Sequence, residues 1–181
     1  MSAWSDYYLG RIGDRYPNYC RRRYQPLLRE LVAAKGFTFR EEGCGIGTIS
    51  KILLQDKVCK KLELCDNDRD ILDLAYRNIT HLGLENTRLS LTDVVVSPHA
   101  LVDVIFAHGV LEHFSDEEIQ AILRRQISHC GKVVHYVPTN GYAEPSFGDE
   151  RLLAPEYWVD KWSPTRHELF NDNKDLLLIW E

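Results

Sequence analysis

The sequence has few of the features that mark disulfide-rich, membrane-spanning or zinc-binding proteins. Its five cysteines are scattered and form no Cys-x-x-Cys pair, which argues against a disulfide framework or a cysteine zinc site. Its seven histidines are equally dispersed, so no metal site is predicted. No apolar run reaches the length of a membrane span, and the residues after Met1 do not resemble a signal sequence. Together these absences predict a cytoplasmic protein.

The length and the net charge of the chain narrow the class of protein further. A chain of 181 residues can bury one core but is short for two ordinary domains, so residues 1–181 are predicted to form a single domain. The hydrophobic fraction of 44% and the charged fraction of 27% are typical of a globular protein. A net charge of −5 disfavours nucleic acid and anionic membranes as partners.

Three glycines at alternate positions, Gly43, Gly45 and Gly47, lie between an apolar segment and a helical one. Such a loop can expose its N–H groups and let a ligand lie against the main chain. A short strand ends at Asp66, roughly twenty residues later, where nucleotide-binding folds place an acid for ribose hydroxyls. Thr48 stands where a dinucleotide motif needs its third glycine, so a nucleoside without a pyrophosphate fits this loop better.

Strand and helix patterns alternate along most of the chain. Strands are predicted at 37–42, 61–66, 87–93, 101–107 and 132–137. Helices are predicted at 49–55, from 68 to a stop near His81-Leu82-Gly83, and at 115–129 before a stop at Cys130-Gly131. After a loop and a short helix at 155–158, strands at 165–170 and 175–180 flank a turn and are predicted to pair as a hairpin. This order predicts an α/β fold, a three-layer αβα sandwich whose mostly parallel seven-stranded sheet ends in an antiparallel hairpin.

Residues 1–35 are predicted to form an arm beside a core at 36–181. The arm is aromatic and irregular from Trp4 to Pro17 and helical from Tyr24 to Ala34. It can pack on the sheet edge or cover an active site. The tyrosines of the arm favour a role as a cover over the active site, because a tyrosine side chain combines apolar area with a polar tip.

The ordered motifs resemble those of class I S-adenosylmethionine-dependent methyltransferases. The resemblance runs from about Phe37 to the carboxyl terminus. It rests on four stretches in the family's order: Glu41-x-Gly-Cys-Gly-x-Gly, the strand ending in Asp66, Leu91-Thr92-Asp93, and Phe106-Ala-His-Gly-Val-Leu-Glu-His-Phe. It implies S-adenosylmethionine as the cofactor.

The resemblance also implies how the glycine loop and its flanking acid are used. The loop residues that pass close to the methionine part and the ribose are Gly43, Cys44, Gly45 and Gly47, with Cys44 a small filler. Glu41 matches the acid that contacts the methionyl amino group. The family usually has apolar residues where Arg40 and Glu42 stand. Either these two charges pair, or the strand is less covered than usual.

The remaining implied contacts follow the next strands. Asp66 binds the ribose hydroxyls, and Asn67 lies against the adenine. Asp93 accepts a hydrogen bond from the adenine amino group, and Val94 donates its backbone N–H. His108 follows the fourth strand, where the family lines the space beside the reactive methyl group.

In a methyltransferase of this family, catalysis is expected to depend mainly on aligning the acceptor with the methyl group. If a base is needed, His108 is the first candidate and His113 the second. The acceptor is expected to be an oxygen or nitrogen of a small molecule, in a monomeric or homodimeric enzyme; a protein acceptor stays possible. Two alternatives remain open, namely a catalytically inactive S-adenosylmethionine-binding or scaffold protein and a nucleotide-dependent oxidoreductase.

Overall fold

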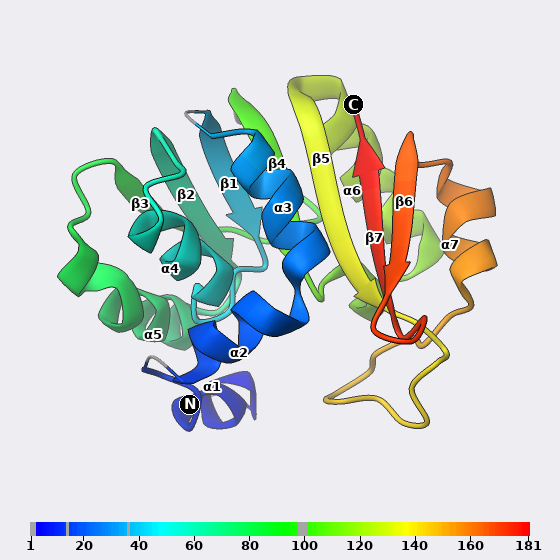
Figure 1. Cartoon of the computed structure of the whole chain (residues 1–181), viewed down its shortest axis with the longest axis horizontal. Coiled ribbons are helices and arrows are strands. Elements are labelled where there is room, and N and C mark those ends of the chain that lie inside the picture. The colour runs from blue at the N-terminus through cyan, green and yellow to red at the C-terminus, as the bar shows by residue number, and fades with distance from the viewer. Residues whose placement is uncertain (1–2, 14, 36, 98–100) are drawn as a thin grey trace.

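A seven-stranded sheet runs through the middle of the molecule (Figure 1). The computed structural model describes residues 3–13, 15–35, 37–97 and 101–181, so residue 36, the predicted start of the core, lies outside them. The elements in chain order are α1 (Ala3–Leu9), α2 (Arg15–Arg23), α3 (Gln25–Ala33), β1 (Thr38–Glu42), α4 (Thr48–Gln55), β2 (Lys61–Asp66), α5 (Arg69–Ile79), η1 (Thr80–Leu82), β3 (Thr87–Leu91), β4 (Val102–His108), η2 (Leu111–His113), α6 (Asp116–His129), β5 (Cys130–Pro138), α7 (Pro155–Trp162), β6 (Arg166–Phe170) and β7 (Asp175–Trp180).

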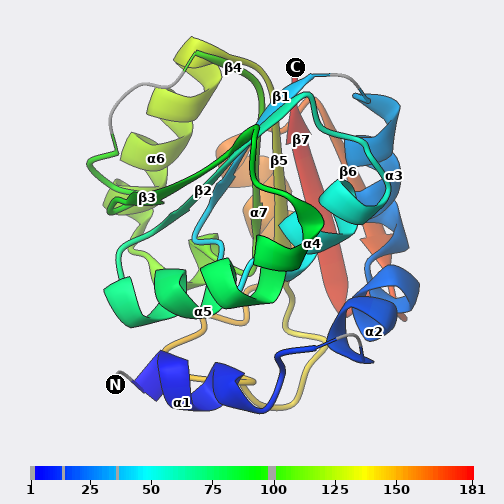
Figure 2. The ribbon, with the colours of Figure 1, turned by 90° about the vertical axis from the view of Figure 1, so that its left-hand side faces the viewer.

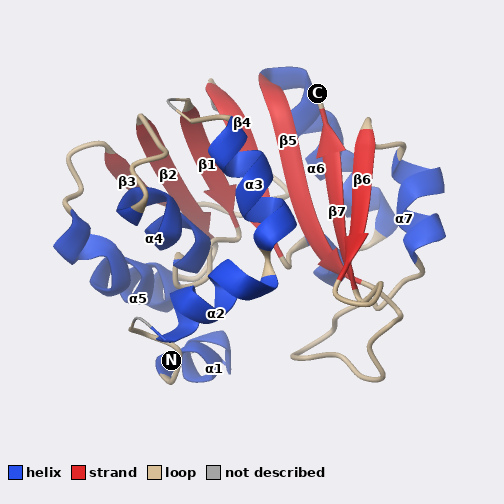
Figure 3. Ribbon diagram, viewed as in Figure 1, coloured by secondary structure: helices blue, strands red, loops and turns tan. Residues whose placement is uncertain are grey.

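The strands lie in the order β3-β2-β1-β4-β5-β7-β6. The first five are parallel, and β7 is inserted antiparallel between β5 and β6. Helices α3, α4 and α5 cover one face of the sheet, and α6 and α7 cover the other (Figures 1 and 2). The predicted three-layer sandwich with its carboxyl-terminal hairpin is therefore confirmed. The carboxyl ends of the parallel strands all point toward α1 and the loop at 139–154 (Figure 3).

Three local predictions are wrong. The segment from Trp4 to Pro17, expected to be irregular, is largely helical, since α1 covers Ala3–Leu9 and α2 begins at Arg15. Pro17 is tolerated because it lies in the first turn of α2, where its missing N–H does no harm. Helix α6 does end at Cys130-Gly131 as predicted, but β5 begins at Cys130 itself and not at Lys132. Helix α7 continues four residues past Trp158 to Trp162, because the apolar side chains of Trp158, Val159 and Trp162 pack together against the sheet. Among the described helices, none has the length and apolar character to cross a membrane.

The charges in β1 pair with each other and with α6. Glu42 is fully buried, and Arg40 Nε lies 3.0 Å from its Oε1. Arg125 of α6 approaches both carboxylate oxygens, at 3.0 and 2.6 Å, and the Gln126 amide donates a hydrogen bond at 2.8 Å. Of the two possibilities left by the sequence, pairing is confirmed. Strand alternation then directs Glu41 to the opposite face of the sheet.

Removing the Glu42 carboxylate should destabilise the fold strongly. Glu42→Ala leaves Arg40 and Arg125 buried without their shared counter-ion, and the free energy of unfolding should fall by about 3–5 kcal/mol in urea denaturation. Asp56→Ala is the matched control, because the ion pair of Asp56 with Arg21 is exposed and should contribute at most about 1 kcal/mol. Equal losses of unfolding free energy in the two variants would contradict the importance assigned to the buried ion cluster around Glu42.

Candidate functional site

The loop between β1 and α4 has no room for side chains at its glycines. Gly43 and Gly47 both have a φ of 66°, in the left-handed region that favours glycine. A Cβ atom on Gly43 would lie 2.6 Å from a methyl group of Val110, and one on Gly47 would lie 2.7 Å from a methyl group of Leu64. The loop backbone therefore packs directly against the ends of neighbouring elements.

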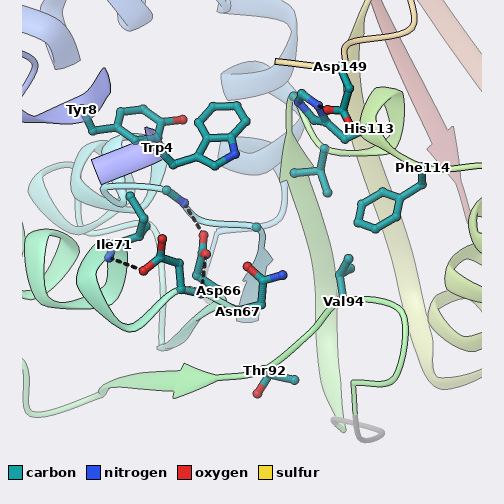
Figure 4. A pocket seen from close by; sticks show the side chains of 15 residues that line it. Trp4, Tyr8, Asp66, Asn67, Ile71, Thr92, Val94, His113, Phe114 and Asp149 are labelled. Carbon is teal, nitrogen blue, oxygen red and sulfur yellow. Dashed lines mark hydrogen bonds and ion pairs between the residues drawn. The ribbon is translucent and has the colours of Figure 1, made fainter. Parts of the chain in front are cut away.

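A cavity of about 300 Å³ opens above this loop, and we call it the glycine-loop cavity. It lies at the carboxyl ends of the parallel strands, where open α/β sheets bind ligands. Figure 4 shows Trp4 and Tyr8 of α1 on one side of it and Asp66 and Asn67 beneath them. Its lining consists of Trp4, Tyr8, Gly43, Gly45, Asp66, Asn67, Asp68, Ile71, Thr92, Val94, Gly109, Val110, His113, Phe114 and Asp149.

Asp66 at the end of β2 joins the loop to the cavity. Its Oδ2 accepts a hydrogen bond of 3.0 Å from Gly45 N, and its Oδ1 accepts one of 3.1 Å from Asp68 N. Burial raises the pKa of Asp66 to about 6, so the carboxylate is mostly ionised at neutral pH. A carboxylate has about four acceptor positions, so the carboxylate keeps acceptor capacity for a polar ligand. Asp68 rather than Asp66 caps α5, accepting from Asp70 N at 2.8 Å.

Glu41 lies behind the glycine loop rather than in the lining of the main cavity. The Ser50 hydroxyl donates a hydrogen bond to it, and burial raises its pKa to about 8. With Gly43, Cys44 and His108 it lines a gap of about 20 Å³. The Cys44 thiol is buried, and burial raises its pKa well above the usual range, which suits a packing role and not a nucleophile.

The structure separates Asp93 from its neighbours in the predicted site. Thr92 and Val94 line the glycine-loop cavity, but Asp93 between them does not. Asp93 is exposed, and its Oδ1 accepts a hydrogen bond of 2.8 Å from Val95 N. The carboxylate therefore holds the turn after β3 and leaves Val94 facing the cavity.

His108 at the end of β4 is enclosed by aromatic rings. It stacks on Tyr136 with ring centroids 4.7 Å apart, and Tyr24 contacts it edge-on at 4.2 Å. Its buried Nε2 has no hydrogen-bond partner among the described residues. Burial lowers the pKa of His108 to about 4, so the ring is neutral at physiological pH.

A second cavity of about 480 Å³ lies beside His108, and we call it the tyrosine cavity. It shares Trp4, Tyr8, Gly109 and His113 with the glycine-loop cavity, so the two spaces adjoin. Three acids, Glu112, Glu144 and Glu150, also line it. The tyrosines in its wall are Tyr7, Tyr8, Tyr16, Tyr19, Tyr24, Tyr136 and Tyr142.

His113 and Glu112 lie in η2, where the two cavities meet. His113 Nδ1 lies 2.8 Å from Asp149 Oδ1. Glu112 is only 1% exposed, and burial raises its pKa to about 8. Arg151 N donates a hydrogen bond of 2.9 Å to Glu112 O, which holds the loop carrying Asp149 against η2.

The sequence missed the residues that arrive from distant segments. Ile71, Phe114 and Asp149 line the glycine-loop cavity together with Trp4 and Tyr8. Only the aromatic content of the arm signalled a contribution from Trp4 and Tyr8. Nothing in the sequence near Asp149 indicated that its loop folds back onto η2.

Comparison with known proteins agrees with this architecture. Residues 41–131 match the profile of the family described as Methyltransferase domain, which is half of the chain. No curated protein matches the chain.

Two solved structures illustrate the shared fold. The N-methyltransferase NodS from Bradyrhizobium japonicum WM9 is 17% identical with a TM-score of 0.69, over 90% of this chain and 96% of NodS. The magnesium protoporphyrin IX methyltransferase ChlM from Synechocystis PCC 6803 is 16% identical with a TM-score of 0.69, over 87% of this chain and 80% of ChlM. At these identities the likeness concerns the fold.

The buried carboxyl of Glu41 should make stability depend on pH. Its pKa is raised in the folded state, so its contribution is complete below the unfolded value and is lost as the pH rises toward about 8. Glu41→Gln removes this ionisation, and one pKa unit corresponds to about 1.4 kcal/mol. Urea denaturation between about pH 5 and pH 8 should therefore show the variant gaining stability relative to the wild type as the pH rises. A difference that stays constant over this range would contradict the raised pKa.

Proposed function

This chain belongs to the methyltransferase domain family, and from that membership we propose that it methylates an oxygen or nitrogen atom of a small-molecule acceptor. S-adenosylmethionine is the methyl donor of the family. The neighbouring structures of NodS and ChlM contain S-adenosylhomocysteine, and ChlM was also solved with S-adenosylmethionine.

The observation that carries the proposal is the contact between the glycine loop and Asp66, in which Gly45 N donates a hydrogen bond to the Asp66 carboxylate. The ionised Asp66 carboxylate faces a cavity of about 300 Å³, with acceptor positions free for ribose hydroxyls. Asn67, Ile71 and Val94 line the same cavity and offer a mixed polar and apolar slot for an adenine ring. We assign the methionine end to the side of the loop nearest Glu41 and His108.

The residues of the chain contribute mainly alignment. S-adenosylmethionine supplies a sulfonium methyl group that is already activated toward a lone pair. The two adjoining cavities hold donor and acceptor side by side, and such positioning can lower a barrier by roughly 7–11 kcal/mol in ideal cases. His108 stays neutral, and a group with a pKa of about 4 is a weak base. We therefore assign His108 a hydrogen bond that orients the acceptor, with His113 as the second group beside the methyl position.

The tyrosine cavity supports a small-molecule acceptor. Its volume of about 480 Å³ lies within the range of roughly 300–1,000 Å³ that is usual for small-molecule pockets. Its wall is largely aromatic and carries three acids against one arginine, Arg11. The chain also has a net charge of −5, and both features disfavour a polyanionic acceptor such as nucleic acid. We assign Tyr142, which lines this cavity, a contact with the acceptor.

We also propose that the arm at residues 1–35 covers both cavities. Trp4 and Tyr8 line each of them, and Trp4 contacts Phe147 of the loop at 139–154 with ring centroids 4.5 Å apart. All five cysteines are free, which fits a reducing cytoplasmic compartment. The protein is proposed to act as a monomer or homodimer.

Calorimetric titration with S-adenosylmethionine, S-adenosylhomocysteine and NADH tests the donor. The first two should bind saturably and NADH should not. Asp66→Ala should weaken binding by about 10- to 100-fold, because hydrogen bonds to a charged group contribute about 1.5–3 kcal/mol. Asp73→Ala is the control, since Asp73 is an exposed acid on α5 outside the glycine-loop cavity.

The possible results separate the functions. Binding of S-adenosylhomocysteine that is equal in Asp66→Ala and Asp73→Ala would refute the placement of the ribose. NADH binding in place of both sulfur ligands would favour an oxidoreductase. Donor binding without S-adenosylhomocysteine production, across a broad panel of small hydroxyl and amine acceptors, would favour an inactive binding protein.

The cover can be tested with tryptophan fluorescence. Trp4 lies at the cavities, whereas Trp158, Trp162 and Trp180 belong to the cluster around α7 and β7. Adding S-adenosylhomocysteine should change the tryptophan emission of the wild type and of Trp162→Phe, and most of that change should disappear in Trp4→Phe. A full response in Trp4→Phe would show that the arm does not sense the bound ligand.

A further inference from the structure

A cluster of possible metal ligands lies where the two cavities meet. Glu112, His113 and Glu150 each offer one ligand atom, and these atoms lie within 4.8 Å of one another. Glu112 and His113 belong to η2, and Glu150 comes from the loop that Arg151 ties to η2. All three line the tyrosine cavity, and His113 also lines the glycine-loop cavity.

An unpartnered buried oxygen points to a missing ligand in this cluster. Glu112 is 1% exposed, and its Oε2 has no hydrogen-bond partner among the described residues. Leaving a polar atom buried and unpaired costs free energy, and most buried polar atoms in proteins have a partner. A cation bound between Glu112 and Glu150 would satisfy this oxygen.

The other two side chains are held in place by neighbours. His113 Nδ1 lies 2.8 Å from Asp149 Oδ1, and Figure 4 shows the His113 ring directly beside the Asp149 carboxylate. Pairing with a carboxylate commonly orients a histidine whose other ring nitrogen binds a metal. Glu150 accepts hydrogen bonds of 2.7 and 2.6 Å from the Ser146 backbone N–H and hydroxyl, which fixes its carboxylate as well.

We propose that Glu112, His113 and Glu150 bind a divalent metal ion that holds an oxygen of the acceptor. Two carboxylates and one imidazole suit ions such as Mn²⁺, and three protein ligands leave coordination positions open for a substrate. The ion would bind and orient a hydroxyl of the acceptor beside His113, and a metal-bound hydroxyl loses its proton more readily than a free one. This inference rests on the proposed function, which it narrows to acceptors with a hydroxyl group.

An ammonium group of the acceptor is the competing occupant, since carboxylates and tyrosine rings also attract cations. The histidine favours the metal. A neutral imidazole is a common metal ligand, whereas two carboxylates suffice for an ammonium group. The dispersed histidines of the sequence predict no metal site, so the proposal depends on the tertiary contact between η2 and the loop that carries Glu150.

Direct measurement of Mn²⁺ binding tests the site. The full chain, treated with EDTA and dialysed, is titrated with MnCl₂ while free Mn²⁺ is followed by electron paramagnetic resonance. The wild type should bind Mn²⁺ saturably at one site, and Glu150→Gln and Glu112→Gln should each weaken binding at least tenfold. Glu144→Gln is the matched control, because Glu144 lines the same cavity outside the cluster and its loss should leave Mn²⁺ binding unchanged.

Titration of each protein with S-adenosylhomocysteine separates the two proposals. A wild type that binds S-adenosylhomocysteine but not Mn²⁺ overturns the metal site and leaves the methyltransferase proposal standing. Equal weakening in Glu144→Gln and Glu150→Gln also overturns it, because the acidic wall as a whole would then attract the ion. Site-specific Mn²⁺ binding supports the metal site even if S-adenosylhomocysteine fails to bind, and that failure would count against the proposed function alone.

Discussion

Neutralisation of the buried Glu42 carboxylate determines how the centre of this molecule is arranged. Arg40 approaches it along β1, and Arg125 and Gln126 reach it from α6. The same Arg125 donates a hydrogen bond of 2.9 Å to Val94 O, so the ion cluster also fixes a wall of the glycine-loop cavity. Because side chains alternate along a strand, anchoring Glu42 on the α6 side places Glu41 on the α4 side, against Ser50. With Glu41 and Glu42 each held on its own face of the sheet, the direction in which the glycine loop leaves β1 is fixed.

Local patterns in the sequence were sufficient for most of the fold but for only part of the site. Apolar strands, the Ser115 capping box and the turn after β6 are local signals, and the structure has each of these elements where they predict. Helices α1 and α2 were missed because their many tyrosines obscure helical periodicity. Glu41, Asp66 and His108 follow from their positions beside strand ends. The aromatic content of the arm did indicate a contribution from Trp4. The contributions of Asp149 and Glu150 depend on a distant loop folding over the sheet, which no local pattern encodes.

The two cavities differ in how they are built. The glycine-loop cavity has the backbone of a constrained loop and one carboxylate at its base, and most of its lining follows the ends of parallel strands. The tyrosine cavity is lined mainly by side chains of the arm and of the loop at 139–154, which lie outside the sheet. Under the proposed function, changes at positions that line the tyrosine cavity but not the glycine-loop cavity, such as Tyr19 and Tyr142, would alter the acceptor preference and leave the donor site intact.

The inserted strand β7 has a consequence for the order of assembly. Among the described strands, β6 pairs with β7 alone, and β7 joins it to β5. During synthesis β6 leaves the ribosome first and has no place in the growing sheet until β7 follows. The parallel half can form while the chain is still emerging, but its β5 edge stays unpaired until the hairpin closes. An unpaired strand edge can pair with another chain, so closure of the hairpin also protects the apolar edge of β5 from aggregation.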